Sequence, residues 1–182
     1  MTESTDAAQP LLRLRGIGKS FGPVRALTDI NLDIPPGQVT ALVGDNGAGK
    51  STLIKTVSGI WEPSGGQRQS VAVAKAIMGD AKLVIMDEPT AALGVSQTDL
   101  VLSLIDRLSS RGIAVLVISH NLTDVFRVAD RLAVLYLGRL VSSGPLSDYD
   151  TSSAVHWMTT GTAPNNGTAS NNGSAAVQNA EG

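Results

Sequence analysis

Residues 44–52 run Gly44-Asp45-Asn46-Gly47-Ala48-Gly49-Lys50-Ser51-Thr52, and the first eight fit the pattern of Gly, four residues and Gly-Lys-Ser. The apolar run 39–43 predicts a buried strand before this stretch, and residues 51–57 predict a helix after it that ends at Gly59. Glycines let successive N–H groups curl inward around an anion, and the helix N-terminus adds partial positive charge there. This context is typical of a phosphate-binding loop, so the chain is predicted to bind a nucleoside triphosphate. The alternative, a glycine-rich turn with an exposed lysine, leaves both flanking elements unexplained.

The residue types of this loop suit different roles in phosphate binding. Lys50 has the charge and length to reach the β- and γ-phosphates, and the Ser51 hydroxyl suits a Mg²⁺ ligand. The loop residues expected to bind the nucleotide are Gly44, Asn46, Gly47, Ala48, Gly49, Lys50, Ser51 and Thr52.

Composition restricts the class of protein. The 182 residues suffice for one domain, and because aromatic residues make up only 3%, its core must consist mainly of Val, Leu, Ile and Ala. A net charge of −2 provides no basic field for nucleic acid, and no apolar run is long enough for direct membrane insertion. The absence of cysteine excludes disulfides and thiol chemistry, and residues 1–10 lack the apolar core of a secretion signal. The expected compartment is therefore the cytosol.

The first third of the chain predicts a small antiparallel sheet. Residues 11–15 predict a strand and 16–22 a loop, and alternating apolar and polar residues predict half-buried strands at 24–27 and 30–34. The turn Pro35-Pro36-Gly37 then leads into the strand before the glycine loop.

The remainder alternates strands with helices, which predicts an α/β fold with a parallel sheet covered on both faces. The expected helices are 67–78, 96–110 and 121–129, and the expected strands are 82–87, 113–118, 131–137 and its hairpin partner 139–141. The face of helix 96–110 predicted to be buried consists of Leu100, Val101, Leu104, Ile105 and Leu108. Residues 1–10 are predicted to be a disordered N-terminus, 11–158 the domain, and 159–182 a disordered tail of low complexity.

Two adjacent acids follow the apolar residues of strand 82–87. Open α/β sheets bind ligands at the carboxyl ends of their strands, so Asp87 and Glu88 are expected beside the glycine loop. Side chains alternate along a strand, which predicts separate roles: Asp87 as a contact to Mg²⁺ and Glu88 as the base that polarises the attacking water. The alternative is an acidic strand end that faces solvent.

His120 follows the next buried strand and is expected to emerge beside these acids. A histidine there would hydrogen-bond the γ-phosphate and orient the water, although a lone histidine more often caps or packs a helix. Its place at a third strand end favours the functional role. His156 has no such neighbours and is interpreted as structural.

Together these residues resemble the nucleotide-binding subunit of an ABC transporter, from about Leu11 to Leu146. Residues 44–51 resemble its Walker A motif, and 83–88 its Walker B motif with the catalytic glutamate. The resemblance implies a three-layer P-loop NTPase core with an N-terminal antiparallel β subdomain, and ATP and Mg²⁺ as cofactors. It also implies that Phe21 stacks on adenine, that Val24 lies in the same site, and that His120 is the switch histidine.

A third motif concerns the partner subunit. Residues 64–69 resemble the signature motif, which in the family caps the γ-phosphate bound by the other subunit of a head-to-tail dimer. This assigns Ser64, Gly65, Gly66 and Gln67 to nucleotide binding, and they precede a predicted helix whose N-terminus would offer N–H donors. Residues 91–96 and 119–122 further resemble ATPases of simple-sugar importers.

The sequence departs from the family pattern in one large interval. Residues 52–64 are all that separate Ser51 from Gly65, where the family has a core strand, a glutamine-bearing Q-loop and most of a helical subdomain. No glutamine lies between Gln38 and Gln67, so the Q-loop is absent and the domain is truncated. Loss of a strand would leave unpaired backbone and uncovered apolar residues, which predicts a destabilised domain with an intact phosphate loop. An internally deleted gene and an erroneous gene model explain the gap equally well.

Two smaller departures lie outside this interval. Pro63 begins the signature motif where the family usually has leucine. Gly94 replaces an aspartate that organises the dimer interface, although members of the sugar-importer kind tolerate glycine there.

Two readings remain. In the first, the chain forms a dimer with a second nucleotide-binding subunit and hydrolyses ATP. This hydrolysis drives a membrane permease for sugar import, and the chain lies at the cytoplasmic side of the plasma membrane. In the second, it is a binding module that holds ATP but has lost hydrolysis and permease coupling. The first is favoured for the family and the second for the activity of this chain. A P-loop GTPase or kinase is disfavoured because the sequence has neither an Asn-Lys-x-Asp guanine pattern nor a substrate-phosphate lid, and because it retains a remnant of the signature motif.

Overall fold

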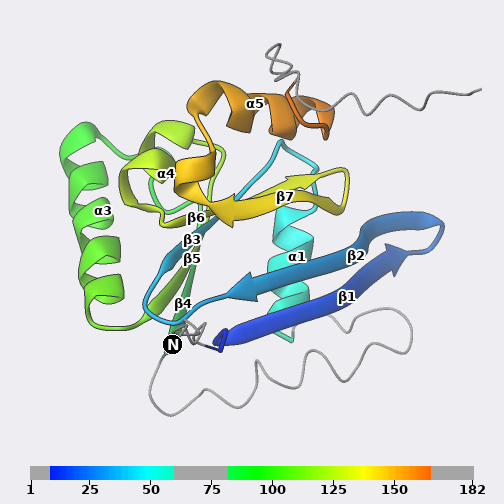
Figure 1. Ribbon diagram of the computed structural model, residues 1–182, viewed down its shortest axis with the longest axis horizontal. Helices are drawn as coiled ribbons and strands as arrows, with labels where there is room; N and C mark the ends of the chain where they lie inside the picture. Colours follow the sequence, from blue (N-terminus) through cyan, green and yellow to red (C-terminus); the bar gives the residue numbers. More distant parts are fainter. Residues whose placement is uncertain (1–8, 60–81, 165–182) are drawn as a thin grey trace, which may run out of the picture.

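The structure, a computed structural model, describes residues 9–59 and 82–164 (Figure 1). Its strands are β1 (Leu12–Phe21), β2 (Val24–Ile34), β3 (Val39–Val43), β4 (Leu83–Asp87), β5 (Ala114–Ile118), β6 (Arg131–Tyr136) and β7 (Arg139–Pro145). Its α-helices are α1 (Lys50–Val57), α3 (Val95–Ser110), α4 (Leu122–Val128) and α5 (Thr151–Thr160), and Leu146–Asp148 form a short 3-10 helix. The predicted helix 67–78 lies outside the described residues.

The central sheet has the strand order β4-β5-β3-β6-β7, in which the first four strands are parallel and β7 is antiparallel to β6. The strand that precedes the glycine loop, β3, has a neighbour on each side and is buried at every residue. The carboxyl ends of β3, β4 and β5 therefore lie at one edge of the sheet. The predicted α/β class and the separate antiparallel β1–β2 pair are both confirmed.

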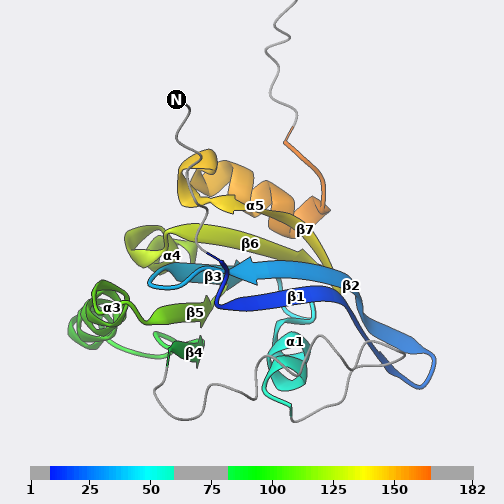
Figure 2. The same cartoon turned by 60° about the horizontal axis from the view of Figure 1, so that its bottom comes forward.

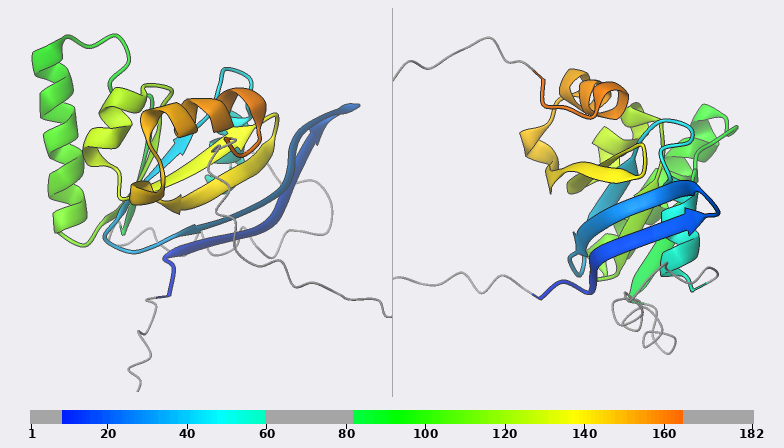
Figure 3. Two further views of the ribbon diagram at one scale, coloured as in Figure 1. Left: turned by 45° about the horizontal axis from the view of Figure 1, so that its top comes forward. Right: turned by 90° about the vertical axis from the view of Figure 1, so that its right-hand side faces the viewer.

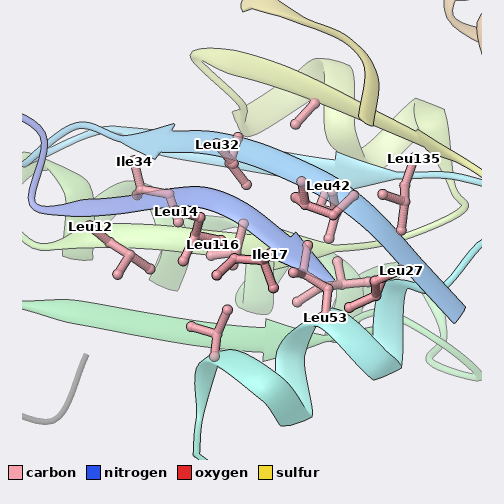
Figure 4. Packing of buried hydrophobic residues seen from close by; sticks show 14 of the residues in the cluster. Leu12, Leu14, Ile17, Leu27, Leu32, Ile34, Leu42, Leu53, Leu116 and Leu135 are labelled. Carbon is pink, nitrogen blue, oxygen red and sulfur yellow. The ribbon is translucent and has the colours of Figure 1, made fainter. Parts of the chain in front are cut away.

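One face of the sheet packs against α1 and the β1–β2 hairpin. Figure 4 shows the side chains that fill this layer, where Leu12, Leu14 and Ile17 of β1 meet Leu53 of α1 and Leu116 of β5. All of them are 2% exposed or less. Burial of five such side chains contributes about 1.5–3 kcal/mol each, so this layer fixes α1, and with it the glycine loop, against the sheet.

Helices α3, α4 and α5 cover the opposite face (Figure 3). Leu102 and Ile105 of α3 pack on Val115 and Val117 of β5, and α4 and α5 pack over β3 and β6. The sheet thus lies between one layer made of α1 and the β1–β2 hairpin and another made of α3, α4 and α5. This is the three-layer arrangement that the α/β pattern predicts.

The buried face of α3 matches the predicted one only in part, because Ile105 is buried and Val101 and Leu108 pack against the same cluster, as predicted. Leu102 and Ile105 are buried, whereas Leu100 is 67% and Leu104 is 43% exposed. The helix is rotated towards Leu102 because it packs over β5 and contacts α4, where Asp99 pairs with Arg127 at 2.8 Å. A leucine-rich helix has two adjacent apolar faces here, and tertiary packing selects between them.

Residues 16–21 form part of β1, which corrects the predicted loop. Gly16 adopts a left-handed φ of 61°, and its N–H donates to Asn31 Oδ1 at 2.9 Å. The pairing register shifts between Leu14 and Ile17, so the strand has a bulge and then continues to Phe21. The residues predicted as two strands at 24–27 and 30–34 likewise form one strand, with Asp29 in the left-handed region.

Helix α5 was not predicted from the sequence. Its N-terminus is capped by Asp150, whose Oδ1 accepts the Ser153 N–H at 2.6 Å. Its buried Ala154 and Met158 pack in one cluster with Leu132 and Val134 of β6. Its last residue is Thr160, the second residue of the segment predicted as a tail, and Gly161 is its C-cap. The bulk of that tail, residues 165–182, lies outside the described residues.

Strand β4 is the outermost described strand on its side of the sheet (Figure 2). Its residues Leu83 to Met86 are only half-buried, in contrast with the fully buried β3 and β5. The half-exposed apolar residues of β4 thus lie on a strand with one flank that has no described partner, and the destabilised domain stays a prediction. No helix in the described ranges is long and apolar enough to cross a membrane.

Candidate functional site

A cleft of about 560 Å³ opens at the carboxyl ends of the strands. This volume falls in the range of about 300–1,000 Å³ that is usual for small-molecule sites. Four segments line it: the start of β2, the glycine loop with the start of α1, the end of β4, and the turn between β6 and β7. The lining residues are Val24, Arg25, Ala26, Asp45, Asn46, Gly47, Gly49, Lys50, Ser51, Thr52, Asp87, Glu88, Leu137 and Gly138.

The glycine loop has the curled backbone that its sequence predicts. Gly47 has φ 83° and Gly49 has φ 103°, backbone conformations that residues other than glycine rarely adopt. A Cβ on Gly49 would lie 3.0 Å from the Ala26 carbonyl oxygen, so the loop also approaches β2 closely at this point. Gly49 is the N-cap of α1, which places the helix N-terminus at the cleft.

Lys50 is buried within the loop that precedes it. Its side chain is 8% exposed, and Nζ donates to the carbonyl oxygens of Gly44 at 2.6 Å and Asp45 at 3.1 Å. A buried ammonium needs such acceptors, because desolvation without partners is costly. The loop thus fixes one positive charge at the cleft wall.

Asp87 and Glu88 reach the same cleft from the end of β4. The Glu88 N–H donates to the Ile118 carbonyl at 2.8 Å, which ties the residue to the end of β5. Glu88 has φ 47°, an uncommon conformation for a non-glycine residue that costs of order 1–3 kcal/mol and clusters at functional sites. The bend re-aims the Glu88 side chain after a regular strand.

Two residues from the end of β5 hold the Glu88 carboxylate. His120 Nδ1 lies 2.9 Å from Oε1, and the Ser119 hydroxyl donates to Oε2 at 3.4 Å. His120 itself does not line the cleft, and 60% of its side chain is exposed. The structure therefore brings His120 beside Glu88, as expected from the strand ends, and connects it to the cleft through that carboxylate.

The remaining predicted contacts divide into three groups. Val24 lines the cleft, whereas Phe21, its partner in the β1–β2 ladder, does not, and the Phe21 ring centroid lies 5.4 Å from Lys19 Nζ. Gly44 and Ala48 are buried in the loop behind the lining residues. Ser64, Gly65, Gly66 and Gln67 lie outside the described residues, so the signature motif stays a prediction.

Five lining residues were not predicted as site residues: Arg25, Ala26, Asp45, Leu137 and Gly138. The sequence predicts a hairpin at Gly138 but contains no signal that this turn reaches the glycine loop. Only the sheet order shows it, because β6 lies next to β3.

The polar residues of the cleft fit a phosphate-bound divalent cation. Ser51 is exposed at the start of α1 and Asp87 is exposed at the end of β4, and both line the cleft. Within residues 9–59 and 82–164, no group of three or more His, Cys, Asp or Glu side chains could hold a metal ion. Mg²⁺ characteristically takes one or two protein oxygens and completes its shell with phosphates and water. A hydroxyl and a carboxylate beside a phosphate loop match that requirement.

Comparison with known proteins identifies the family. The model of the ABC transporter family matches residues 27–64 and 61–91. The fructose import ATP-binding protein of Rhizobium meliloti is 31% identical over 252 positions, covering 87% of this chain and 97% of that protein. The ribose import ATP-binding protein of Jannaschia sp. is 30% identical over 240 positions, covering 85% of this chain but 46% of the relative. The chain thus spans about half the length of the ribose-import relatives.

Two features of these comparisons bear on the gap that the sequence predicts. The alignment with the fructose-import relative covers more positions than the 182 residues of this chain, so the relative has residues without a counterpart here. The two segments matched by the family model meet at residues 61–64, where the predicted deletion lies.

Solved structures show the same fold. A nucleotide-free ATP-binding cassette from an ABC transporter superposes with a TM-score of 0.66 at 19% identity, covering 75% of this chain and 92% of that one. CbiO1 of Clostridium perfringens, part of an ABC transporter complex, gives a TM-score of 0.67 at 20% identity, covering 81% and 93%. With the family model, the import relatives and the cleft in agreement, the chain belongs to the ABC transporter family, as a nucleotide-binding domain of the sugar-importer type.

Proposed function

We propose that this chain binds ATP with Mg²⁺ in the cleft between the glycine loop and the end of β4. One observation carries the proposal: a lysine held in a glycine loop, two acids and a helix N-terminus, from segments far apart in the sequence, converge on a single cleft. An acidic strand end alone or a glycine turn alone would not produce this arrangement.

Each residue has a role that its position supports. The Lys50 ammonium would exchange its contacts with the Gly44 and Asp45 carbonyls for β- and γ-phosphate oxygens. Ser51 and Asp87 would hold Mg²⁺, which when bound neutralises phosphate charge. Glu88 would accept a proton from the attacking water, with His120 and Ser119 orienting its carboxylate.

By similarity to import ATP-binding proteins, the chain would serve a sugar importer. It would pair with a second nucleotide-binding subunit, through Ser64 to Gln67 of the signature motif, and contact a membrane permease. It would then lie at the cytoplasmic side of the membrane. Ribose, fructose, and xylose or arabinose are the sugars named for the relatives.

A second function is favoured by the gap before Gly65. The interval that holds the Q-loop in the family has no glutamine here, and the permease-docking region belongs to the same interval. For this chain we therefore favour a module that binds ATP with little hydrolysis and no permease coupling.

The proposal is tested by measuring Mg²⁺·ATP affinity and turnover of the purified chain beside Lys50→Ala. Loss of a charge-assisted contact of about 1.5–3 kcal/mol weakens ATP binding roughly tenfold to a hundredfold. Lys55→Ala is the matched control, because Lys55 is exposed on the same helix and does not line the cleft. Equal affinity of Lys50→Ala and the unaltered chain would contradict the phosphate-loop assignment.

Turnover separates the two functions. Hydrolysis that Glu88→Gln abolishes supports an active ATPase subunit. ATP binding with a turnover no higher than that of Glu88→Gln supports the binding module.

A further inference from the structure

The turn between β6 and β7 is the part of the cleft wall that the proposed function leaves without a role. It consists of Leu137 and Gly138, both of which line the cleft. Sheet order places it opposite the acids, because β6 is the neighbour of β3 on one side and β5 and β4 lie on the other. The glycine loop at the end of β3 thus lies between the acids and this turn.

Backbone hydrogen bonds hold the turn against two other segments. The Gly138 N–H donates to the Ala48 carbonyl of the glycine loop at 2.9 Å, and the Gly138 carbonyl accepts the Thr28 N–H of β2 at 2.7 Å. A Cβ at Gly138 would overlap the Ala26 carbonyl. Leu137 is therefore presented at the cleft by a turn that is fixed relative to the phosphate loop.

Leu137 itself is in an unfavourable state for a leucine. Its φ is 44°, and its side chain is 70% exposed. Hairpin turns with left-handed residues favour Asn, Asp or Gly, and a leucine there costs roughly 1–2 kcal/mol of backbone strain. A large apolar side chain that is strained and exposed gains little from the folded chain alone, which points to a contact with a ligand.

Val24 supplies a second exposed apolar side chain to the same cleft. It is 63% exposed and lies at the start of β2, the strand to which Gly138 is bonded through Thr28. The cleft therefore has an acidic side, with Asp87 and Glu88, and another side where Leu137 and Val24 expose apolar surface next to Arg25. A nucleotide has the same division, since its terminal phosphate is charged and its base presents apolar ring surface.

We infer that Leu137 contacts the nucleoside part of the bound nucleotide and is a specificity-determining residue of the cleft. This inference rests on the proposed function. The terminal phosphate and its cation lie towards Asp87 and Glu88, the β-phosphate lies over the glycine loop, and the base and ribose extend past Gly138 between Leu137 and Val24. Leu137 then selects for a nucleoside group over bare polyphosphate through the burial of apolar surface.

The test compares ATP with inorganic tripolyphosphate, each with Mg²⁺, on the unaltered chain and on Leu137→Ala. Removing the side chain is expected to weaken ATP binding about threefold to tenfold, because part of a buried leucine contact is lost. Tripolyphosphate has no nucleoside, so its affinity is expected to stay unchanged. Leu137→Gly is expected to weaken ATP binding in the same way and to leave tripolyphosphate binding unchanged. Because glycine accepts the left-handed φ, its thermal midpoint is expected not to fall, which shows that the loss of affinity does not come from misfolding.

Leu100→Ala is the matched control, since Leu100 is exposed to a similar degree on α3 and does not line the cleft. Unchanged ATP affinity in Leu137→Ala would overturn the inference alone. Equal losses for ATP and tripolyphosphate would also overturn it, because they would mean that Leu137 shapes the phosphate loop. An unaltered chain that binds neither compound would overturn the proposed function together with this inference.

Discussion

The Nδ1 atom of His120 lies 2.9 Å from Oε1 of Glu88, so the ends of β5 and β4 are joined through a side-chain pair at the cleft. Glu88 has the lining position and the left-handed backbone, whereas His120 lies behind it. Under the proposed function, the carboxylate therefore faces the attacking water, and the imidazole orients the carboxylate.

Substituting Glu88→Gln is expected to tighten Mg²⁺·ATP binding, because a carboxylate and the phosphates share one cleft and repel each other. At a separation of about 4 Å and a dielectric constant near that of water, removal of one such charge is worth about 1 kcal/mol, or roughly fivefold in Kd. Isothermal titration calorimetry measures it. The control is Asp106→Asn, an exposed acid on α3, and weaker binding by Glu88→Gln would contradict the placement of Glu88.

Substituting Gly138→Ala is expected to destabilise the fold and weaken ATP binding together. The new Cβ meets the Ala26 carbonyl in a left-handed backbone, so the turn must shift, and its bond to Ala48 moves the phosphate loop. We expect a loss of about 2 kcal/mol or more in urea unfolding. Gly112→Ala is the control, because Gly112 has φ 81° with nothing within 4 Å of a Cβ. Equal losses in the two variants would show that backbone strain alone is responsible.

Substituting Ile105→Ala is expected to lower the free energy of unfolding by about 2–5 kcal/mol, because Ile105 is fully buried between α3 and the sheet. Leu100→Ala on the same helix is expected to change it by less than about 0.5 kcal/mol, since that side chain is exposed. Denaturant titration of both variants checks the rotation of α3. A larger effect at Leu100 would restore the face predicted from the sequence.

The ion pair between Arg15 and Asp33 gives a pH-dependent contribution to stability. Arg15 donates to Asp33 at 2.7 Å, and this bond lowers the pKa of the Asp33 carboxyl below its ordinary 3.8. Because the folded-state pKa is the lower one, the contribution is complete well above pH 3.8 and is lost as the pH falls through the folded-state value. The pair is exposed, so solvent screening keeps its contribution at pH 7 small.

The corresponding measurement is the difference in urea unfolding between the unaltered chain and Asp33→Asn at pH 7 and at pH 3. The difference is expected to shrink at the lower pH. A difference that grows on acidification would mean that Arg15 does not stabilise the ionised Asp33 carboxylate in the folded state.

Sequence patterns predict the glycine loop and the parallel strands around it better than they predict β1 and the helices α3 and α5. The glycine loop, β3, β5 and the acids at the end of β4 follow from local patterns, since each is a short apolar run followed by a characteristic polar group. The strand through Gly16 and the face of α3 do not, because a bulge and a helix rotation depend on residues far away in the chain. Helix α5 has a capping box at Asp150 and Ser153, a local signal that apolar periodicity alone does not reveal.

The site shows the same division. Lys50, Ser51, Asp87 and Glu88 were predicted from motif and strand position, and all four line one cleft. Leu137 and Gly138 were not, since their role depends on β6 lying beside β3, which periodicity does not determine. Phe21 was assigned through family resemblance, and in this structure it lies outside the cleft lining.

The order of the strands determines which internal deletions leave the glycine loop anchored in the sheet. Strand β3 keeps hydrogen-bonded neighbours on both flanks, and β4 alone among the described parallel strands has one flank without a described partner. The predicted gap between Ser51 and Gly65 therefore leaves intact the pairing of β3, the strand that anchors the glycine loop. The consequence concerns solubility: the half-exposed Leu83 to Met86 lie on a strand with one flank that has no described partner, and such an edge favours association with other chains.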